Sequence, residues 1–255
     1  MNRYVKNLER IEFVITWACT GRCKHCSEGE HEAKGVHIKG NAAARVVTEV
    51  CDKFSIDSVM TFGGEPLLYP DEVCAIHKAA YEMNIPKRQV ITNGYFSTDT
   101  DAIKRTAARL AENGVNSIAL SVDAFHQETI PLEPVKTFAN AVREAGVPVK
   151  THPAWLGGSE ASNPYNKRTH EILKEFEAIG IRASKGNDIF PAGNALKYFG
   201  SYFDSSEKYV NPYDENPDDV RAISISPDGS VLSDNIYRRG ILDIIENYEP
   251  GGERK

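Results

Sequence analysis

The feature that most constrains the fold is an alternation of short apolar, β-branched segments with amphipathic helical segments. A strand pattern followed by a helix pattern occurs six times between residues 11 and 202. Because two parallel strands need a long crossover, usually a helix, this alternation predicts an α/β protein with a parallel sheet. The expected strands are 11–18, 58–62, 89–92, 117–122, 147–155 and 181–190, and the expected helices are 41–54, 70–83, 100–112, 134–145, 167–179 and 194–202.

The pattern changes after residue 203. Residues 204–219 are polar and rich in Asn, Pro and Asp, which is typical of a connecting loop. Segments 222–226 and 231–232 flank the turn sequence Pro227-Asp228-Gly229, so we expect a β-hairpin, followed by a short helix at 241–248. The sequence therefore predicts an α/β unit over residues 1–203 and a C-terminal extension over residues 204–255.

Composition excludes several classes of protein. With 255 residues, 41% apolar and 26% charged, the chain can bury one sizeable core. The net charge is −6 and no block of Lys and Arg occurs, which argues against a nucleic-acid partner. No apolar stretch approaches the roughly 20 residues of a membrane span, and the first ten residues lack the apolar core of a signal peptide. We therefore expect a cytoplasmic protein without a membrane partner.

Three of the five cysteines crowd into eight residues directly after the first expected strand. Cys19, Cys23 and Cys26 have the spacing C-x3-C-x2-C, on a loop that contains Gly21. Three thiolates so placed can converge on one point, and soft thiolates select iron–sulfur clusters, Zn or Cu(I).

Two readings of this loop remain open from the residues alone. A zinc site needs a fourth ligand, which His25 or His31 could supply. A three-thiolate [4Fe–4S] cluster instead leaves one iron free to bind another molecule. The other cysteines, Cys51 and Cys74, fall at helical spacing among apolar neighbours, so we interpret them as packed thiols.

A second motif, Gly63-Gly64-Glu65-Pro66, follows the second expected strand. Alone it would be a strand-ending turn. Together with the cysteine loop after the first strand, it resembles the radical S-adenosylmethionine (SAM) enzymes. In that family three cysteines hold a [4Fe–4S] cluster, SAM chelates the fourth iron, and the GGEP motif binds the ammonium group of SAM.

The resemblance implies further cofactor contacts at other strand ends. Asn93, Ser121 and Asp123 occupy positions that lie near SAM or the substrate in the family, although Asn93 would also suit a simple turn. His25 stands before the third cysteine, where the family usually has an aromatic residue. Ala192 follows the sixth strand, where family members place backbone against adenine.

All these residues fall at the carboxyl ends of expected parallel strands, where α/β proteins place their sites. With the resemblance, this favours a partial (β/α)6 TIM-like barrel with a short C-terminal β-hairpin plus helix extension over a flat sheet. His126 and His152 are candidate catalytic residues at the same end. A solvent-facing loop histidine and a hydrogen-bonded interior histidine are the alternatives.

The resemblance also implies an activity. A low-potential donor such as flavodoxin or ferredoxin would reduce the cluster, and SAM would be cleaved to a 5′-deoxyadenosyl radical that takes a hydrogen atom from the substrate. The C-terminal segment is similar to the opening of the SPASM or twitch segments of peptide and protein maturases. No cysteine follows Cys74, so we expect one [4Fe–4S] cluster and no auxiliary cluster.

Three hypotheses follow for the function. The first is modification of a peptide or protein. Only about ten residues precede the first strand, so we expect any leader recognition to come from a partner protein. The second is a small-molecule radical SAM enzyme or a glycyl-radical activase. The third is a non-catalytic Fe–S or Zn protein, against which the GGEP motif argues.

Overall fold

The computed structural model describes residues 2–31, 35–204, 206, 208–209, 211 and 214–251. Its main element is a six-stranded parallel sheet in the order β5-β4-β3-β2-β1-β8. The strands are β1 (Arg10–Val14), β2 (Ser58–Phe62), β3 (Lys87–Thr92), β4 (Ser117–Leu120), β5 (Val149–Thr151) and β8 (Ala222–Ile225). The helices that connect the first five are α1 (Gly40–Cys51), α2 (Pro70–Glu82), α3 (Thr100–Glu112) and α4 (Leu132–Glu144), and α5 (Pro164–Glu177) follows them.

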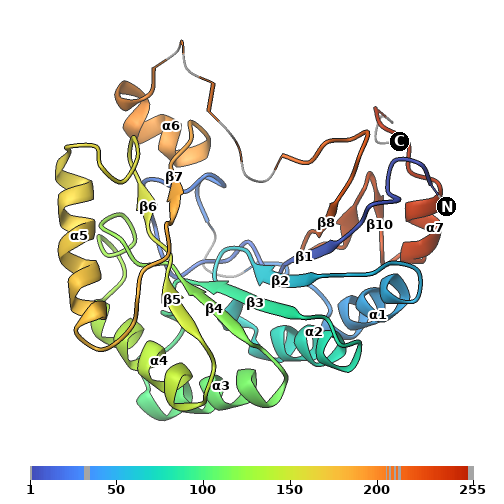
Figure 1. The fold of residues 1–255 in the computed structure, drawn as a ribbon, viewed down its shortest axis with the longest axis horizontal. Helices are drawn as coiled ribbons and strands as arrows, with labels where there is room; N and C mark the ends of the chain where they lie inside the picture. Colours follow the sequence, from blue (N-terminus) through green and yellow to red (C-terminus); the bar gives the residue numbers. More distant parts are fainter. Residues whose placement is uncertain are drawn as a thin grey trace.

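The two faces of this sheet differ in burial in its central strands. Phe13, Thr61, Val90 and Ile118 are aligned across four neighbouring strands and are almost fully buried. The alternate positions, such as Met60 and Ile91, are only partly buried. Figure 1 shows the connecting helices along the convex side of the sheet, with the concave side left open. The described residues thus form a partial barrel rather than a closed one, which confirms the expected fold class.

The far edge of the barrel is interrupted. The expected strand at 147–155 is divided into β5 and β6 (Ala154–Trp155), because Pro153 between them lacks a backbone N–H. The sixth expected strand consists of a bridge from Thr151 to Ala183 and a short strand β7 (Asn187–Asp188), which pairs in parallel with β6. This sixth unit ends in α6 (Gly193–Phe199) and a 3₁₀ turn, η2 (Gly200–Tyr202).

The C-terminal segment differs from the expected hairpin. The expected turn at Pro227-Asp228-Gly229 forms, since the Ser226 N–H donates across it to the Ser230 carbonyl at 2.9 Å. The strand before it, β8, nevertheless adds to the main sheet in parallel with β1, and its Ile223 and Ile225 are buried. The hairpin forms one step later, between β9 (Ser230–Val231) and β10 (Asp234–Asn235). The edge of β1 offers β8 a full row of backbone donors and acceptors. Segment 231–232, the partner expected in the hairpin, is only two residues long and offers fewer, so β8 pairs with β1. The final helix, α7 (Ile241–Glu246), is shorter than expected.

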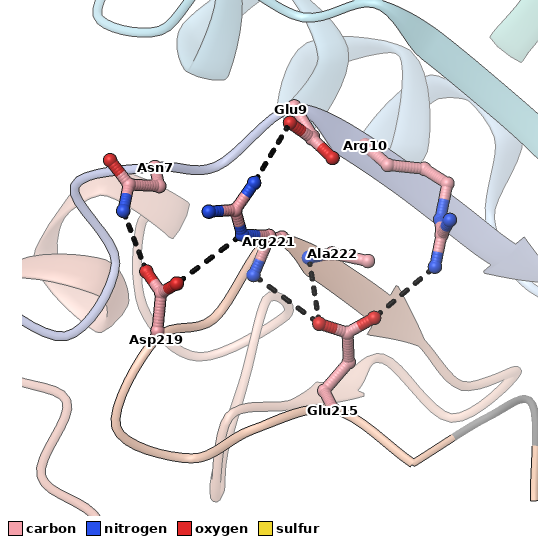
Figure 2. A network of polar contacts seen from close by, with 7 residues as sticks. All are labelled: Asn7, Glu9, Arg10, Glu215, Asp219, Arg221 and Ala222. Atoms are coloured by element: carbon pink, nitrogen blue, oxygen red, sulfur yellow. Dashed lines mark hydrogen bonds and ion pairs between the residues drawn. The ribbon is translucent and has the colours of Figure 1, made fainter. Parts of the chain in front are cut away.

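A polar network fastens the C-terminal segment to the start of β1 (Figure 2). The Glu215 carboxylate accepts hydrogen bonds from the Arg221 backbone and from Arg10, at 3.3 and 3.2 Å. Asp219 accepts from Asn7 at 2.7 Å and from the Arg221 guanidinium at 3.2 Å. Exposed pairs of this kind stabilise little individually, so the strand pairing of β8 carries most of the attachment.

The apolar interior has two parts. The main core lies between the sheet and its helices. A smaller cluster comprises Phe125, Leu156, Ile189, Ala195 and Phe199, and it packs α6 against the loops that follow β4 and β6. None of the described helices is both long and apolar enough to span a bilayer.

Candidate active site

A cavity of about 350 Å³ opens at the carboxyl ends of the strands, on the concave side of the sheet. It collects residues from the cysteine loop, from the ends of β2 to β4, and from the segment around β6 and β7. The residues singled out from the sequence that line it are Cys19, Cys23, His25, Cys26, Gly63, Gly64, Asn93, Ser121, His126 and His152. Four others are not among its lining residues, namely Glu65, Pro66, Asp123 and Ala192.

The cysteine loop is shaped by Arg22. The Arg22 guanidinium donates to the carbonyls of Cys19 and Gly21, at 2.7 and 2.8 Å, and the Arg22 N–H donates to Thr129 Oγ1 at 3.0 Å. These bonds curl the loop so that three thiols border one cavity. Burial raises the pKa of all three, that of Cys19 to about 11. Thiolates there consequently need a cation to compensate their charge.

The spacing of the thiols separates the two open readings of this loop. Four ligands around one zinc ion would stand about 3.8 Å apart, given Zn–S bonds of about 2.3 Å in a tetrahedron. Among the described residues, the only group of three or more His, Cys, Asp and Glu ligand atoms within 4.8 Å of one another is His25, Asp123 and His126. The three thiols are therefore too far apart for one zinc ion. Cysteine thiolates are the usual ligands of iron–sulfur clusters, so the donor set fits such a cluster.

Gly63 and Gly64 place the end of β2 directly against the root of the cysteine loop. The Gly64 N–H donates to the Thr16 carbonyl at 2.8 Å. A Cβ on Gly63 would lie 2.6 Å from that carbonyl oxygen, and one on Gly64 would lie 2.1 Å from the Ala18 carbonyl oxygen. Gly63 also has φ +136°, which favours glycine. Both glycines are thus required for this close approach.

Glu65 turns away from the cavity into the interior. Its Oε1 accepts from Thr92 Oγ1 at 2.6 Å and from the Leu67 N–H at 2.9 Å, and its Oε2 accepts from the Asn93 N–H at 2.9 Å. Burial raises the pKa of Glu65 to about 7. Its contacts join the ends of β2 and β3, while Pro66 begins the buried 3₁₀ turn η1 (Pro66–Leu68).

Asn93 and Ser121 both reach the cavity. The Asn93 amide donates to Thr20 Oγ1 at 3.2 Å and lies 3.6 Å from Cys19 Sγ. Its oxygen accepts from the Tyr95 N–H, as in a turn. Asn93 therefore supports both interpretations: it shapes a turn, and it also contacts the cysteine loop.

Asp123 holds His126. Asp123 Oδ2 lies 2.8 Å from His126 Nδ1, and its two oxygens accept from the backbone N–H groups of Phe125, His126 and Ala154 at 2.9 Å each. Burial alone would raise the pKa of Asp123, but His126 and these donors hold it below its usual range. Asp123 thus fixes the imidazole of His126 at the cavity and lies behind it.

His25 has an unmet polar atom. Its ring packs against Phe125 and His126, with centroids 5.1 and 4.6 Å apart, and its buried Nδ1 has no hydrogen-bond partner. Burial, followed by the nearby His126, lowers the pKa of His25 to about 4. The ring of His25, which also lines the cavity, therefore has a buried polar atom whose hydrogen-bonding capacity the described residues leave unused.

The two remaining candidates differ in position. His152 lines the cavity and its Nδ1 lies 2.8 Å from Ser184 Oγ, while burial lowers its pKa. Ala192 precedes α6 as its N-cap and does not line the cavity; the preceding Ile189 and Phe190 do.

Sequence reasoning missed several residues. Ser224 and Ser226 reach the cavity because β8 belongs to the main sheet. Asn194, at the start of α6, donates to the cysteine loop. Asp188 and Glu28 are the carboxylates that line the cavity, and none of its described lining residues is Lys or Arg. The position of Ser224 and Ser226 in the strand-like segment 222–226 was the available signal for the first pair, but it required the correct strand pairing.

Comparisons with known proteins agree with this geometry. A probable GTP 3′,8-cyclase of Methanocaldococcus jannaschii is 23% identical over 127 residues, covering 50% of this chain and 40% of that protein. A GTP 3′,8-cyclase of Streptomyces coelicolor is 27% identical over 155 residues, covering 56% and 44%. The chain thus spans less than half the length of these curated relatives.

Solved structures show the same fold. The enzyme anSMEcpe with bound AdoMet superposes with a TM-score of 0.60 at 13% identity, over 94% of this chain and 77% of that one. Streptococcus suis SuiB bound to S-adenosylmethionine gives 0.59 at 13% identity, over 96% and 67%. The family model for the radical SAM superfamily matches residues 13–162, more than half of the sequence. The chain therefore belongs to the radical SAM superfamily, whose cofactors are a [4Fe–4S] cluster and SAM.

Proposed function

We propose that this radical SAM enzyme abstracts a hydrogen atom from a peptide or protein substrate. When bound, the cluster and SAM supply reductive cleavage of SAM and removal of the substrate hydrogen. Cys19, Cys23 and Cys26 would hold the cluster. Their spacing, too wide for one zinc ion, supports this assignment.

The remaining cavity residues would receive SAM. Backbone groups of Gly63 and Gly64 border the cavity beside the cysteine loop, and Asn93 and Ser121 continue the same wall. The unpartnered Nδ1 of His25 offers a polar contact. Glu65, Pro66, Asp123 and Ala192 would act from behind the wall by holding the residues that line it.

The charge of the cavity supports the substrate class, and this observation carries the proposal. The described lining residues include the carboxylates Glu28 and Asp188, four histidines and no Lys or Arg. A nucleoside triphosphate normally requires Lys, Arg or helix N-termini around its phosphates. A neutral or cationic group, such as a peptide side chain, suits this lining better.

A small-molecule substrate is the second candidate, and sequence similarity favours it. Two matched relatives are named as GTP 3′,8-cyclases. The match covers less than half of those proteins, so their substrate does not follow from the similarity. If the substrate is small, the lining charges favour one without phosphate groups.

We further propose that a flavodoxin or ferredoxin reduces the enzyme in the cytoplasm, where its free cysteines would stay reduced. Residues 1–203 would form the catalytic partial barrel. Residues 204–255 would be a SPASM- or twitch-like remnant without a cluster, which contributes Ser224 and Ser226 to the substrate side of the cavity.

The test is anaerobic reconstitution followed by addition of dithionite and SAM. We expect about four irons per chain and release of 5′-deoxyadenosine. The triple variant of Cys19, Cys23 and Cys26 to Ala should lose both, and the matched control Cys51→Ala should keep both. An intact cluster that yields no 5′-deoxyadenosine would contradict the function. Conversion of added GTP over many turnovers would overturn the peptide assignment.

A further inference from the structure

The first turn of α6 lies directly on the cysteine loop, although the two are far apart in sequence. The Asn194 N–H donates to the Cys26 carbonyl at 2.9 Å. The Asn194 side-chain amide donates to the Cys23 carbonyl at 3.3 Å and to the Gly29 carbonyl at 3.1 Å. One residue therefore binds three carbonyls of this loop, two of them belonging to cysteines that face the cavity.

The preceding residue makes this approach possible. A Cβ on Gly193 would lie 2.3 Å from the Ser27 carbonyl oxygen and 2.7 Å from that of Cys26. The φ of Gly193 is +50°, a conformation that also favours glycine. The backbone of α6 thus touches the loop without an intervening side chain.

Apolar side chains of α6 also anchor it outside its contact with the loop carbonyls. Ala195 and Phe199 are buried in the smaller apolar cluster with Phe125 and Ile189. Figure 1 shows α6 at the end of the segment that contains β7, beside the mouth of the barrel. The amide of Asn194 is consequently presented to the loop from a fixed support.

We propose that Asn194 is a positioning residue for the [4Fe–4S] cluster. By holding the carbonyls of Cys23, Cys26 and Gly29, it keeps the loop closed around the bound cluster and fixes the amide dipoles beside it. This inference rests on the proposed function, since it requires that the cluster binds there. Hydrogen bonding and solvent exposure near a cluster set its potential, so the role extends to reduction as well as retention.

The experiment uses the full chain with its reconstituted cluster and measures iron release to an excess of the chelator ferrozine without SAM or substrate. Asn194→Ala should release iron about tenfold faster, because two side-chain hydrogen bonds are lost. Asn194→Asp keeps the size but faces two carbonyls with a carboxylate, so it should release iron faster still. The matched control is Lys197→Ala, which removes an exposed ion pair of 3.1 Å between α6 and Glu30 and a contact of Lys197 Nζ over the Tyr198 ring, but no bond to a loop carbonyl. That control should match the wild type.

The midpoint potential, followed by electron paramagnetic resonance, is the second readout. Asn194→Asp should lower it, since a nearby negative charge disfavours an added electron. If Asn194→Ala does not fold, the isosteric Asn194→Asp carries the test, with its circular dichroism compared to wild type. Wild-type iron release and potential in a folded Asn194→Asp would overturn the proposal, as would an equal effect of Lys197→Ala. A cluster that is retained but yields no 5′-deoxyadenosine would instead count against the proposed function alone.

Discussion

Two buried carboxylates stand at the ends of two strands, and their partners make them behave differently. Glu65, after β2, is held only by neutral donors: the Thr92 hydroxyl and the backbone N–H groups of Leu67 and Asn93. Asp123, after β4, has the His126 imidazole and three backbone N–H groups. Both side chains are completely buried.

Burial alone would raise the pKa of both groups, so the partners decide the outcome. The pKa of Glu65 rises to about 7, whereas His126 holds that of Asp123 below its usual range. The side of the site next to Asn93 and the cysteine loop therefore rests on a carboxylate that takes up a proton near neutral pH. The side next to His126 rests on one that stays charged.

The largest effect is expected from Asp123→Asn. The new amide would point N–H donors at the Ala154 N–H or at His126, and the carboxylate oxygen that contacts His126 Nδ1 would be lost. We expect a loss of about 3–5 kcal/mol in the free energy of unfolding, the usual result of breaking a buried pair. Urea unfolding of the cluster-free protein at pH 7 measures this, with the exposed Asp101→Asn as control. A loss below about 1 kcal/mol would contradict the stabilising role of the charged carboxylate of Asp123.

An intermediate effect is expected from the titration of Glu65. Its folded pKa is about 7 against an ordinary 4.5, so its stabilising contribution is complete below pH 4.5 and is lost as the pH rises through 7. The two values correspond to about 3 kcal/mol. Between pH 5 and 8.5, the unfolding free energy of the wild type should fall relative to that of Glu65→Gln, because the variant has no carboxyl group at this position to titrate.

Subtracting the unfolding free energy of Glu65→Gln from that of the wild type at each pH removes the contributions of titratable groups that both proteins contain. His77 is one, because burial lowers its pKa to about 3 and its effect on stability has the opposite sign. For Asp123 the depressed pKa predicts stability that is present above its unfolded pKa and lost only in strong acid. If the difference between wild type and Glu65→Gln stays flat between pH 5 and 8.5, the contrast between Glu65 and Asp123 is refuted.

The smallest effect is expected from Thr92→Val. It removes the hydroxyl that donates to Glu65 and accepts from the Gly94 N–H. Since that hydroxyl lowers the pKa of Glu65, the pH at which stability is lost should move upward, and stability at pH 7 should fall by about 1 kcal/mol. The same pH series measures both, and an unchanged midpoint would mean that the hydroxyl does not hold the carboxylate.

Local signals predicted most of the helices and strands. The helix expected at 100–112 is α3 to the residue, because Asp99 caps its first turn by accepting from the N–H groups of Asp101 and Ala102. The strand expected at 58–62 is β2. The pairing of β8 with β1 escaped prediction, since it joins residues more than 200 positions apart and leaves no local trace. The hairpin was therefore placed too early.

The candidate site likewise combines features that a local sequence signal predicts with features that arise only from contacts between distant segments. The cysteine spacing and the GGEP motif are contiguous, so they could be recognised in the sequence. The inward turn of Glu65 depends on Thr92 and Asn93, which belong to another strand. Asn194 carries no recognisable pattern, since its role arises only when α6 docks on the loop.

The contact between Asn194 and Cys23 spans 171 residues, which has a consequence for biosynthesis. At about 5–20 residues per second, the ribosome makes Asn194 roughly 10–30 s after Cys23. During that interval the nascent chain carries all three thiols on a loop that nothing from α6 covers. Iron–sulfur delivery in this window meets a loop that α6 does not yet hold, whereas delivery to the completed chain meets a loop whose carbonyls Asn194 already binds.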